Sequence, residues 1–341
     1  MRRAKRFGLV FLALLVPVAA YIGYWRIAAA RIEDGLDGWR QSAAKKQIDV
    51  SWRQLRVRGF PFAFRIEIGN ASLRDRAWNP APQLRLDRLI ATARPWNFDD
   101  WRLAAPAGFS AHLAASGARP ELKLAAKSAE GTAAIGAQSA PWLWVRGADV
   151  TAEALGRVPI KSAEAWITLP AKPAETHTDP SFGLALDMRQ VEVAAPPVNF
   201  GKTIDELAFG VTVRGVLPAG PLAQAAAAWR DAGGTVEVDN LHLDWGGLGI
   251  TASGTFALDE KLQPLAALSG GIEGFDAIVD ALVAADWLIP EQGSILRIAL
   301  SSLAKPGPDG KPQITAPFTI QKGKMYLGPA RLGPAPRIVW E

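Results

Sequence analysis

The chain has 341 residues, of which 49% are hydrophobic and 21% are charged. This length suits one large all-β domain or about two smaller domains, and either can bury a sizeable core. The sequence has no cysteine and three histidines. It therefore excludes disulfides, thiolate metal sites, iron–sulfur clusters and cysteine nucleophiles, and it leaves little for a histidine-rich metal site.

The net charge of +5 is concentrated at the N-terminus. The first 25 residues contain four basic residues, Arg2, Arg3, Lys5 and Arg6, and no acidic residue. In the rest of the chain, the remaining 34 of the 38 basic residues are nearly balanced by 33 acidic residues. A nucleic-acid surface needs a basic stripe or patch, and this distribution gives none, so we expect no nucleic-acid partner.

The basic residues precede an uncharged run of 19 residues, Phe7–Trp25. As a helix the run is about 28 Å long, close to the roughly 30 Å hydrocarbon core of a bilayer. We predict a cytoplasmic basic tail at residues 1–6 and a transmembrane signal anchor at residues 7–25, with the rest of the chain outside the cytoplasm. The expected anchor residues are Phe7, Leu12, Leu15, Tyr21, Tyr24 and Trp25, the last three as interfacial aromatics.

A cleaved signal peptide is the alternative for this segment. Val18-Ala19-Ala20 is an acceptable cleavage site after the apolar run. Both alternatives export the rest of the chain, and an exported domain of this size needs no disulfide.

Helical spacing gives way to strand spacing after residue 47. Residues 26–47 carry a narrow apolar stripe at helical spacing, which predicts an amphipathic helix. From Ile48 onward apolar and polar residues alternate, as in a strand with one buried face. The alternation shifts by one position near Arg53-Gln54, which predicts a β-bulge there.

A hairpin with one apolar face is the best strand signal in the sequence. Gly59-Phe60-Pro61 predicts a turn, and four apolar residues then alternate with polar ones. These four residues, together with a similar run further along the chain, are candidates for an apolar groove or core. The candidates are Phe62, Phe64, Ile66, Ile68, Leu207, Phe209, Val211 and Val213.

The alternation recurs through the rest of the chain and is interrupted by two further helical segments near residues 221–232 and 275–288. A third helix is expected at 295–305. We predict a mainly β (α+β) fold: an N-terminal transmembrane helix, then a large curved antiparallel sheet, resembling a taco or a sandwich, with a few packing helices. A proline-rich polar loop at residues 171–180 divides the sheet into expected subdomains at 48–175 and 176–341.

Several motifs together resemble a bacterial family known as domain of unknown function 2125. The matching residues are Gly59, Phe60, Pro61 and Phe62, then Trp229 with Gly233 and Gly234, then Trp245 and Gly246. The resemblance implies no catalytic residue. The layout is also similar to the AsmA-like group of envelope proteins, which implies a role in outer-membrane homeostasis or phospholipid movement.

These observations lead to three hypotheses for function. The first is an inner-membrane-anchored periplasmic protein, not an enzyme, whose apolar groove holds phospholipid acyl chains. The second is a scaffolding protein with a closed apolar core that binds another envelope protein. The third is a periplasmic hydrolase, which would need a histidine gathered with a serine and an acid, or two carboxylates in one pocket. We predict no catalytic residue, no cofactor and no metal site.

Overall fold

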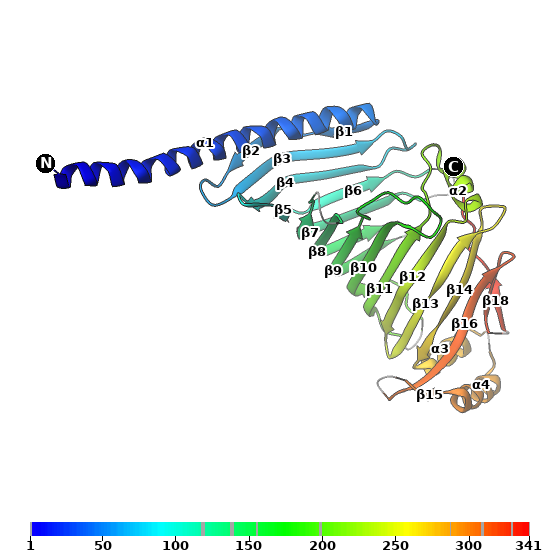
Figure 1. Ribbon diagram of the computed structural model, residues 1–341. Helices are drawn as coiled ribbons and strands as arrows, with labels where there is room; N and C mark the ends of the chain where they lie inside the picture. Colours follow the sequence, from blue (N-terminus) through cyan, green and yellow to red (C-terminus); the bar gives the residue numbers. More distant parts are fainter. Residues whose placement is uncertain are drawn as a thin grey trace.

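The architecture comes from a computed structural model. It describes residues 2–116, 120–136, 140–154, 156–197, 200–286, 288–307, 310–328 and 330–340, without the side chains of residues 2–14, 330 and 332. Within these residues the chain forms four helices and one sheet of 18 strands (Figure 1). The helices are α1 (Arg2–Lys45), α2 (Leu222–Asp231), α3 (Phe275–Ala284) and α4 (Pro290–Leu303). The strands are β1 (Ile48–Ser51), β2 (Gln54–Arg58), β3 (Phe64–Asp75), β4 (Gln83–Arg94), β5 (Asn97–Ala105), β6 (Phe109–Leu113), β7 (Leu122–Ala134), β8 (Trp142–Glu153), β9 (Arg157–Thr168), β10 (Pro180–Glu192), β11 (Thr203–Arg214), β12 (Thr235–Trp245), β13 (Leu248–Leu258), β14 (Pro264–Glu273), β15 (Lys305–Pro306), β16 (Pro312–Gln321), β17 (Lys324–Leu327) and β18 (Ala330–Pro334).

The sheet is an antiparallel meander, as the alternating pattern predicts. β1 and β2 both pair with β3, and β5 and β6 both lie between β4 and β7. From β7 to β14 each strand pairs with the next one in the chain. β9 pairs directly with β10 over Ile160–Thr168, so the expected division near residue 175 does not interrupt the sheet.

The phase shift in the sequence marks a break between β1 and β2. Ser51 pairs with Ser72, and Gln54 pairs with Gly69. Two residues separate these paired positions on each side, 52 and 53 on one and 70 and 71 on the other. No extra residue is inserted, so the predicted β-bulge is absent. Asn70, opposite the break, has a φ of 51°, which lets the strand bend without losing register.

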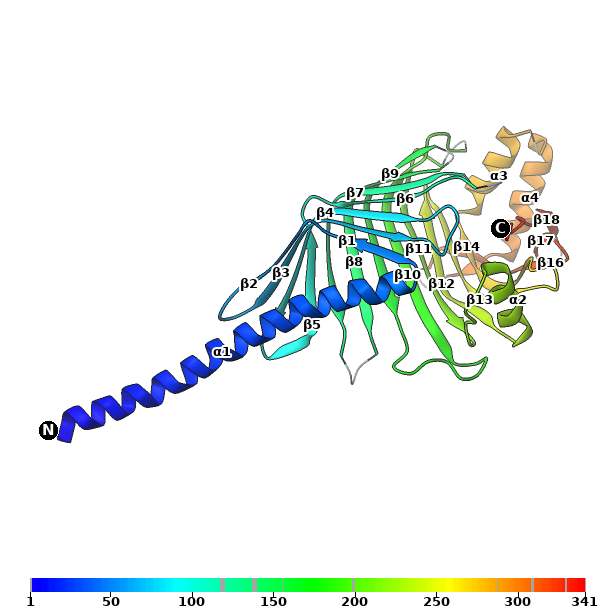
Figure 2. The same cartoon turned by 90° about the horizontal axis from the view of Figure 1, so that it is seen from above.

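The sheet is open and strongly bent (Figures 1 and 2). The accessible surface of the whole chain is 21649 Å². A compact monomer of 36.5 kDa exposes about 13,500 Å². The excess indicates that much of the chain lies on a single exposed layer and on the projecting part of α1, so the sheet is not a closed sandwich around one core.

α1 joins the expected anchor and the expected amphipathic helix into one helix of 44 residues. Its C-terminal part packs on β1 and β2, and its N-terminal part projects beyond the sheet (Figure 2). No helix in the described part of the chain is long and apolar enough to cross a membrane. The side chains of Phe7 and Leu12 lie outside the described residues.

The other predicted helices are present. α2 and α3 match the expected segments to within a few residues, and α4 begins at Pro290, earlier than the expected third helix. α3 buries Phe275 and Val279, and α3 and α4 lie together at the end of the sheet far from the projecting end of α1 (Figure 1).

Candidate functional site

One face of the sheet is continuously apolar. In an antiparallel sheet, directly paired residues point to the same face, so a row can be followed from strand to strand. The central row runs from β2 to β16 and contains only apolar residues and glycine. Its members are Val57, Ile66, Ala91, Leu103, Gly131, Val145, Ala165, Leu186, Phe209, Leu241, Ala252, Gly270 and Ala316.

Two further rows of the same kind flank the central one from β5 onward. One is Trp101, Ala133, Leu143, Ile167, Leu184, Val211, Val238, Gly254, Leu268, Phe318 and Leu327. The other is Ala105, Ala129, Gly147, Ala163, Met188, Leu207, Leu243, Ile250, Ile272 and Ile314. The face that carries these three rows is called the inner face below.

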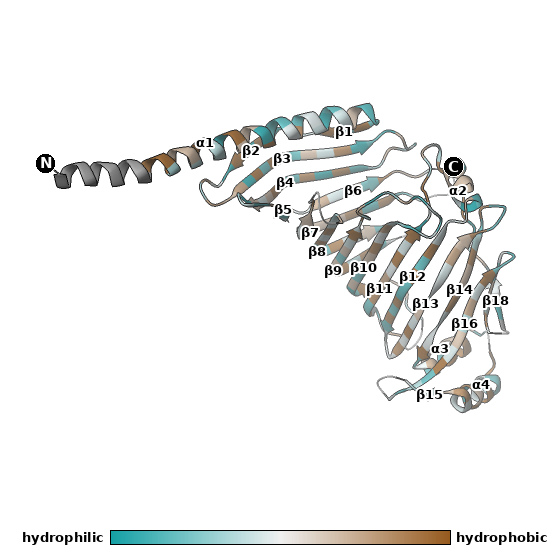
Figure 3. Ribbon diagram, viewed as in Figure 1, coloured by the Kyte–Doolittle hydropathy of each residue, from teal (hydrophilic) through white to brown (hydrophobic). Residues whose placement is uncertain are grey.

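The opposite, outer face is polar. Along one outer row, Arg146 forms an ion pair with Glu164. On the same face Arg189 lies 3.2 Å from Asp187 and 3.5 Å from Glu206, and these carboxylates raise the pKa of Arg189. Figure 3 shows the resulting alternation of hydrophobic and hydrophilic bands along the strands.

The three rows of the inner face are open from β8 to β16, although the next positions on the same face, Val150, Ile160 and Val191, are buried. None of the large side chains in the three rows is buried between β8 and β16; they are half-buried or exposed. Of the predicted candidates, Leu207, Phe209 and Val211 lie in these rows and Val213 lies beside them on the same face, and all four are half-buried. By contrast, Phe64 and Ile66 near the β2 edge are buried, and Ile68 is half-buried.

Phe62 lies in the β2–β3 turn and not in β3. The expected alternation places it in line with Phe64, but the β2–β3 turn extends through it, with its amide N–H donating to the carbonyl of Gly59 at 3.1 Å. β3 begins only at Phe64, and the Phe62 side chain is 74% exposed. Phe62 is therefore not a core residue, and its place in a groove stays a prediction.

A cavity of about 570 Å³ lies at one end of the inner face. Phe182 and Val213 of the sheet, α2, Trp78 of the β3–β4 turn and the C-terminal Trp340 line it. Trp78 lines the same cavity as Phe182 and Val213, although their strands are far apart in the sheet. The sheet therefore curls toward its inner face at this end. The size is typical of a small-molecule site, and the walls are largely aromatic and aliphatic.

The residues of the family-like motifs hold this end of the fold together. Trp229 of α2 is buried, and its indole N–H donates to the carbonyl of Arg214 at 2.7 Å. A side chain at Gly234 would overlap the indole ring, so this position must be glycine for the contact to form. Gly233 has a φ of 80° and ends the turn after α2. These residues are structural.

Trp245 and Gly246 have a similar structural role at the β12–β13 turn. The indole of Trp245 packs on Phe200 with ring centroids 4.9 Å apart and donates to the carbonyl of Gly201 at 3.1 Å. Gly246 has a φ of 56° and lies against the backbone of Phe200.

The aromatic residues at the end of the predicted anchor contact the sheet. The hydroxyl of Tyr21 donates to the carbonyl of Pro61, and the hydroxyl of Tyr24 donates to that of Pro95 at 2.9 Å. Trp25 stacks on Phe64. The sequence contains no signal for these contacts, because the partners are 38 to 71 residues apart. Leu15, which lies beyond the contacts, is 45% exposed.

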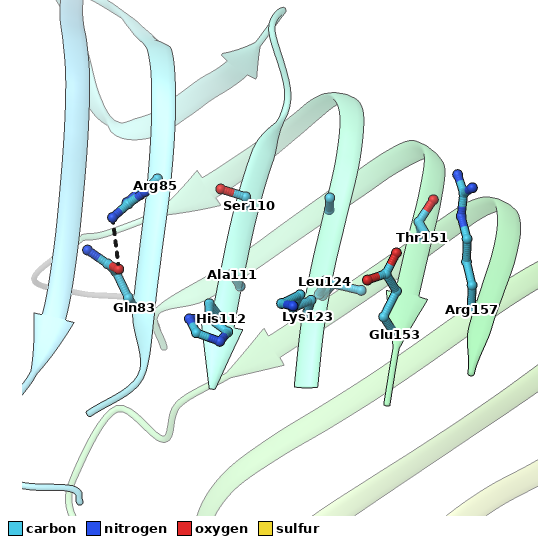
Figure 4. A pocket seen from close by; sticks show the side chains of 11 residues that line it. Gln83, Arg85, Ser110, Ala111, His112, Lys123, Leu124, Thr151, Glu153 and Arg157 are labelled. Atoms are coloured by element: carbon cyan, nitrogen blue, oxygen red, sulfur yellow. Dashed lines mark hydrogen bonds between the residues drawn. The ribbon is translucent and has the colours of Figure 1, made fainter. Parts of the chain in front are cut away.

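A second cavity, of about 480 Å³, lies on the outer face where β4 and β6–β9 meet (Figure 4). His112 borders it and its Nε2 lies 2.7 Å from Glu121. Lys123 lies 2.9 Å from the same carboxylate, and the two neighbours lower the pKa of Glu121. Sequence reasoning missed this carboxylate because it lies nine residues from His112, just before the next strand β7.

This outer cavity does not form the triad that the hydrolase hypothesis needs. Ser110 and His112 are two residues apart on β6, and the imidazole is hydrogen-bonded to Glu121. The cavity walls carry both positively and negatively charged side chains, including Arg85, Arg157 and Glu153 (Figure 4). Within the described residues, no group of three or more histidine or carboxylate side chains is placed to hold a metal ion.

Comparison with known families identifies the family of this chain. The profile of a family described as uncharacterized proteins conserved in bacteria (DUF2125) matches residues 25–336. The chain belongs to this family. The match confirms the resemblance found in the sequence motifs, and it begins at Trp25, the first residue of α1 whose ring stacks on the sheet. No curated protein and no solved structure matches the chain.

Proposed function

We propose that this DUF2125 protein is anchored in the bacterial inner membrane by residues 7–25 and that its β-sheet lies in the periplasm. There, the inner face holds phospholipid acyl chains in support of envelope homeostasis. The observation that carries the proposal is the set of three uninterrupted apolar rows, whose large side chains remain half-buried or exposed from β8 to β16.

An exposed face of this kind favours a long apolar occupant. Burying apolar surface stabilises by about 25 cal/mol per Å², so an uncovered apolar trough gains free energy from any apolar chain laid along it. The rows hold no charged side chain and therefore offer little basis for recognising a polar ligand. Acyl chains are flexible and apolar and need no directional contacts.

The length of the inner face also suits acyl chains. The central row crosses ten strands from β5 to β16 in hydrogen-bonding order. At about 4.8 Å between neighbouring strands, this distance is about 43 Å along the sheet. One leaflet of a bilayer accounts for half of a hydrocarbon core of about 30 Å, so the trough is longer than a single acyl chain.

The scaffolding hypothesis has less support. A closed apolar core would bury the large side chains of the three rows from β8 to β16, whereas these are half-buried or exposed and the described core of the sheet there is a small cluster around Val150, Ile160 and Val191. The layout similar to AsmA-like proteins favours lipid handling, and by analogy we extend the proposal to phospholipid movement between membranes.

Lipid retention by matched variants tests the proposal. The full chain is purified in detergent from bacterial membranes, and bound phospholipid is measured by native mass spectrometry and by organic extraction. Phe209→Asp places a charge in the central inner row, and Thr251→Asp places one on the outer face of β13. The anchor is identical in both variants, so lipid held around the helix cancels.

We expect the unmodified chain and Thr251→Asp to retain the same amount of phospholipid and Phe209→Asp to lose most of it. Equal phospholipid in all three proteins, or none beyond that of the detergent blank, would overturn the proposal. In that case cross-linking to a protein partner would become the next experiment.

A further inference from the structure

Two turns of the sheet stand beside α1 at the place where the helix leaves the domain (Figures 1 and 2). The β2–β3 turn presents Phe60 and Phe62, and the β4–β5 turn presents Trp96. Their side chains are 49%, 74% and 67% exposed. These three residues, called the tip residues below, are large aromatic groups at one end of the sheet. Phe62 and Trp96 are mostly exposed, and the half-exposed ring of Phe60 also contacts the rings of Tyr21 and Trp25.

Hydrogen bonds fix both turns to the helix. Tyr21 donates to Pro61 in the first turn, and Tyr24 donates to Pro95 in the second. The indole of Trp25 donates to the carbonyl of Ala63 at 3.3 Å. The tip residues therefore have a fixed position relative to the helix and cannot enter or leave a membrane independently of it.

Positive charge accompanies the tip residues. An exposed arginine precedes each turn, Arg58 in β2 and Arg94 in β4, and Arg26 follows Trp25 in the helix. The nearest acidic groups along these strands are Glu67, bonded to Arg65 and Arg88, and Asp99-Asp100 after the second turn. Arginine next to exposed aromatic residues is the composition of a membrane interface, and it complements anionic headgroups.

The length of the helix gives an independent argument. Only residues 7–20 of the uncharged run lie beyond the contacts with the sheet. Fourteen residues make about 21 Å of helix, which is shorter than a hydrocarbon core of about 30 Å. The run reaches about 28 Å only if Tyr21, Tyr24 and Trp25 also lie at membrane depth, and the two turns bonded to them must then enter the same layer.

We propose that Phe60, Phe62 and Trp96 form a membrane-docking surface that inserts into the interface of the bilayer that α1 enters. The partner is the phospholipid headgroup and acyl boundary, with anionic lipids beside Arg58 and Arg94. This inference rests on the membrane anchor of the proposed function. It adds that the sheet is held rigidly against the bilayer and does not hang from a free tether.

Site-directed spin labelling tests the depth of each position. The chain has no cysteine, so single-cysteine variants carry one label each. The variants Phe62→Cys and Trp96→Cys report the tip residues. Ile298→Cys is the matched control, because this apolar residue of α4 is 72% exposed but lies at the opposite end of the sheet (Figure 1). Val16→Cys, at a 60% exposed position of α1, reports the anchor itself.

The labelled full-length chain is reconstituted in vesicles of phosphatidylethanolamine and phosphatidylglycerol. Collision rates with oxygen, which concentrates in lipid, and with a water-soluble nickel chelate are then compared. We expect the oxygen-to-nickel ratio at positions 62 and 96 to exceed that at position 298 by several-fold, and we expect the highest ratio at position 16.

Each outcome separates this inference from the proposed function. A lipid-like ratio at position 16 with water-like ratios at 62 and 96 would overturn the docking surface and leave the anchor in place. A water-like ratio at position 16 would overturn the anchor and the docking surface together. Shielding of positions 62 and 96 from both reagents would also overturn the docking surface, because it would indicate a protein partner or a second copy at the tips.

Discussion

The ring of Trp25 stacks on the ring of Phe64, with centroids 5.1 Å apart and planes inclined by 10°. Phe64 is fully buried and begins β3, at the edge of the inner face. The contact therefore joins the predicted anchor to the apolar face and closes that face at one end. It makes the helix and the sheet one structural unit.

Removing the Trp25 ring should destabilise the fold. Truncation of a buried tryptophan to alanine costs about 3–5 kcal/mol, and Trp25 is half-buried, so we expect about 2–3 kcal/mol for Trp25→Ala. The matched control is Ile27→Ala, at a position of the same helix that is 58% exposed, for which we expect less than about 0.5 kcal/mol. Urea unfolding followed by circular dichroism measures both, and equal midpoints would show that the stacking contributes nothing.

A charge at each end of the inner face should have different effects. Phe64→Asp buries an unpaired carboxylate in a dry site, costs several kcal/mol, and should prevent folding. Phe209→Asp places the carboxylate on the half-buried part, where water reaches it, and should leave a folded chain that has lost lipid. Circular dichroism and protease resistance of the two variants check this, and unfolding of Phe209→Asp would mean that the face is a dry core throughout.

The alternation of apolar and polar residues was enough to predict most strands, the antiparallel class and the faces. It placed Leu207 and Phe209 on the same apolar face because alternate residues of any β-strand point to the same side, whichever strand lies next to it. It failed at Phe62, because a turn of tight hydrogen bonds moves the start of β3 by two residues without changing the pattern.

The continuity of the rows and the contacts of α1 could not be read from the sequence. A row such as Leu186, Phe209 and Leu241 exists only once the pairing register of three strands is known. Tyr24 meets Pro95 over 71 residues of separation, and neither position carries a local signal for the other. Trp96 was missed for the same reason, because the membrane-docking role proposed for it depends on the helix that lies beside its turn.

Adding a methyl group at Gly234 should weaken the packing of α2. The new Cβ would overlap the Trp229 indole, and overpacking of this kind costs about 1–3 kcal/mol. Gly35→Ala is the control, because Gly35 lies within α1 with open space around its Cα, and alanine should stabilise the helix slightly. The midpoint of thermal unfolding should fall for the first variant and not for the second; a rise in both would mean that the indole moves aside freely.

Acid should weaken the loop before β10. Asp179 accepts backbone N–H groups of Thr176 at 2.8 Å and Glu175 at 3.0 Å, and these bonds lower the pKa of its carboxyl. The unfolded chain therefore binds a proton more readily at this carboxyl. Its contribution to stability is present above the ordinary pKa of an aspartate and is lost as the pH falls below that value through the lowered pKa of the folded state. Asp179→Asn should remove this part of the pH dependence of the urea midpoint, whereas an unchanged slope would contradict the assignment.

The central claim is that lipid lies on the inner face, and photo-cross-linking inside living bacteria tests it most directly. The photoreactive amino acid p-benzoylphenylalanine is placed at Phe209 in the central row or at the neighbouring Ala208, which belongs to the outer face. After irradiation, the purified full chain is analysed by mass spectrometry for phospholipid adducts. We expect adducts at position 209 and none at position 208. Adducts in equal amounts at both positions, or none at 209 in a folded protein, would contradict it.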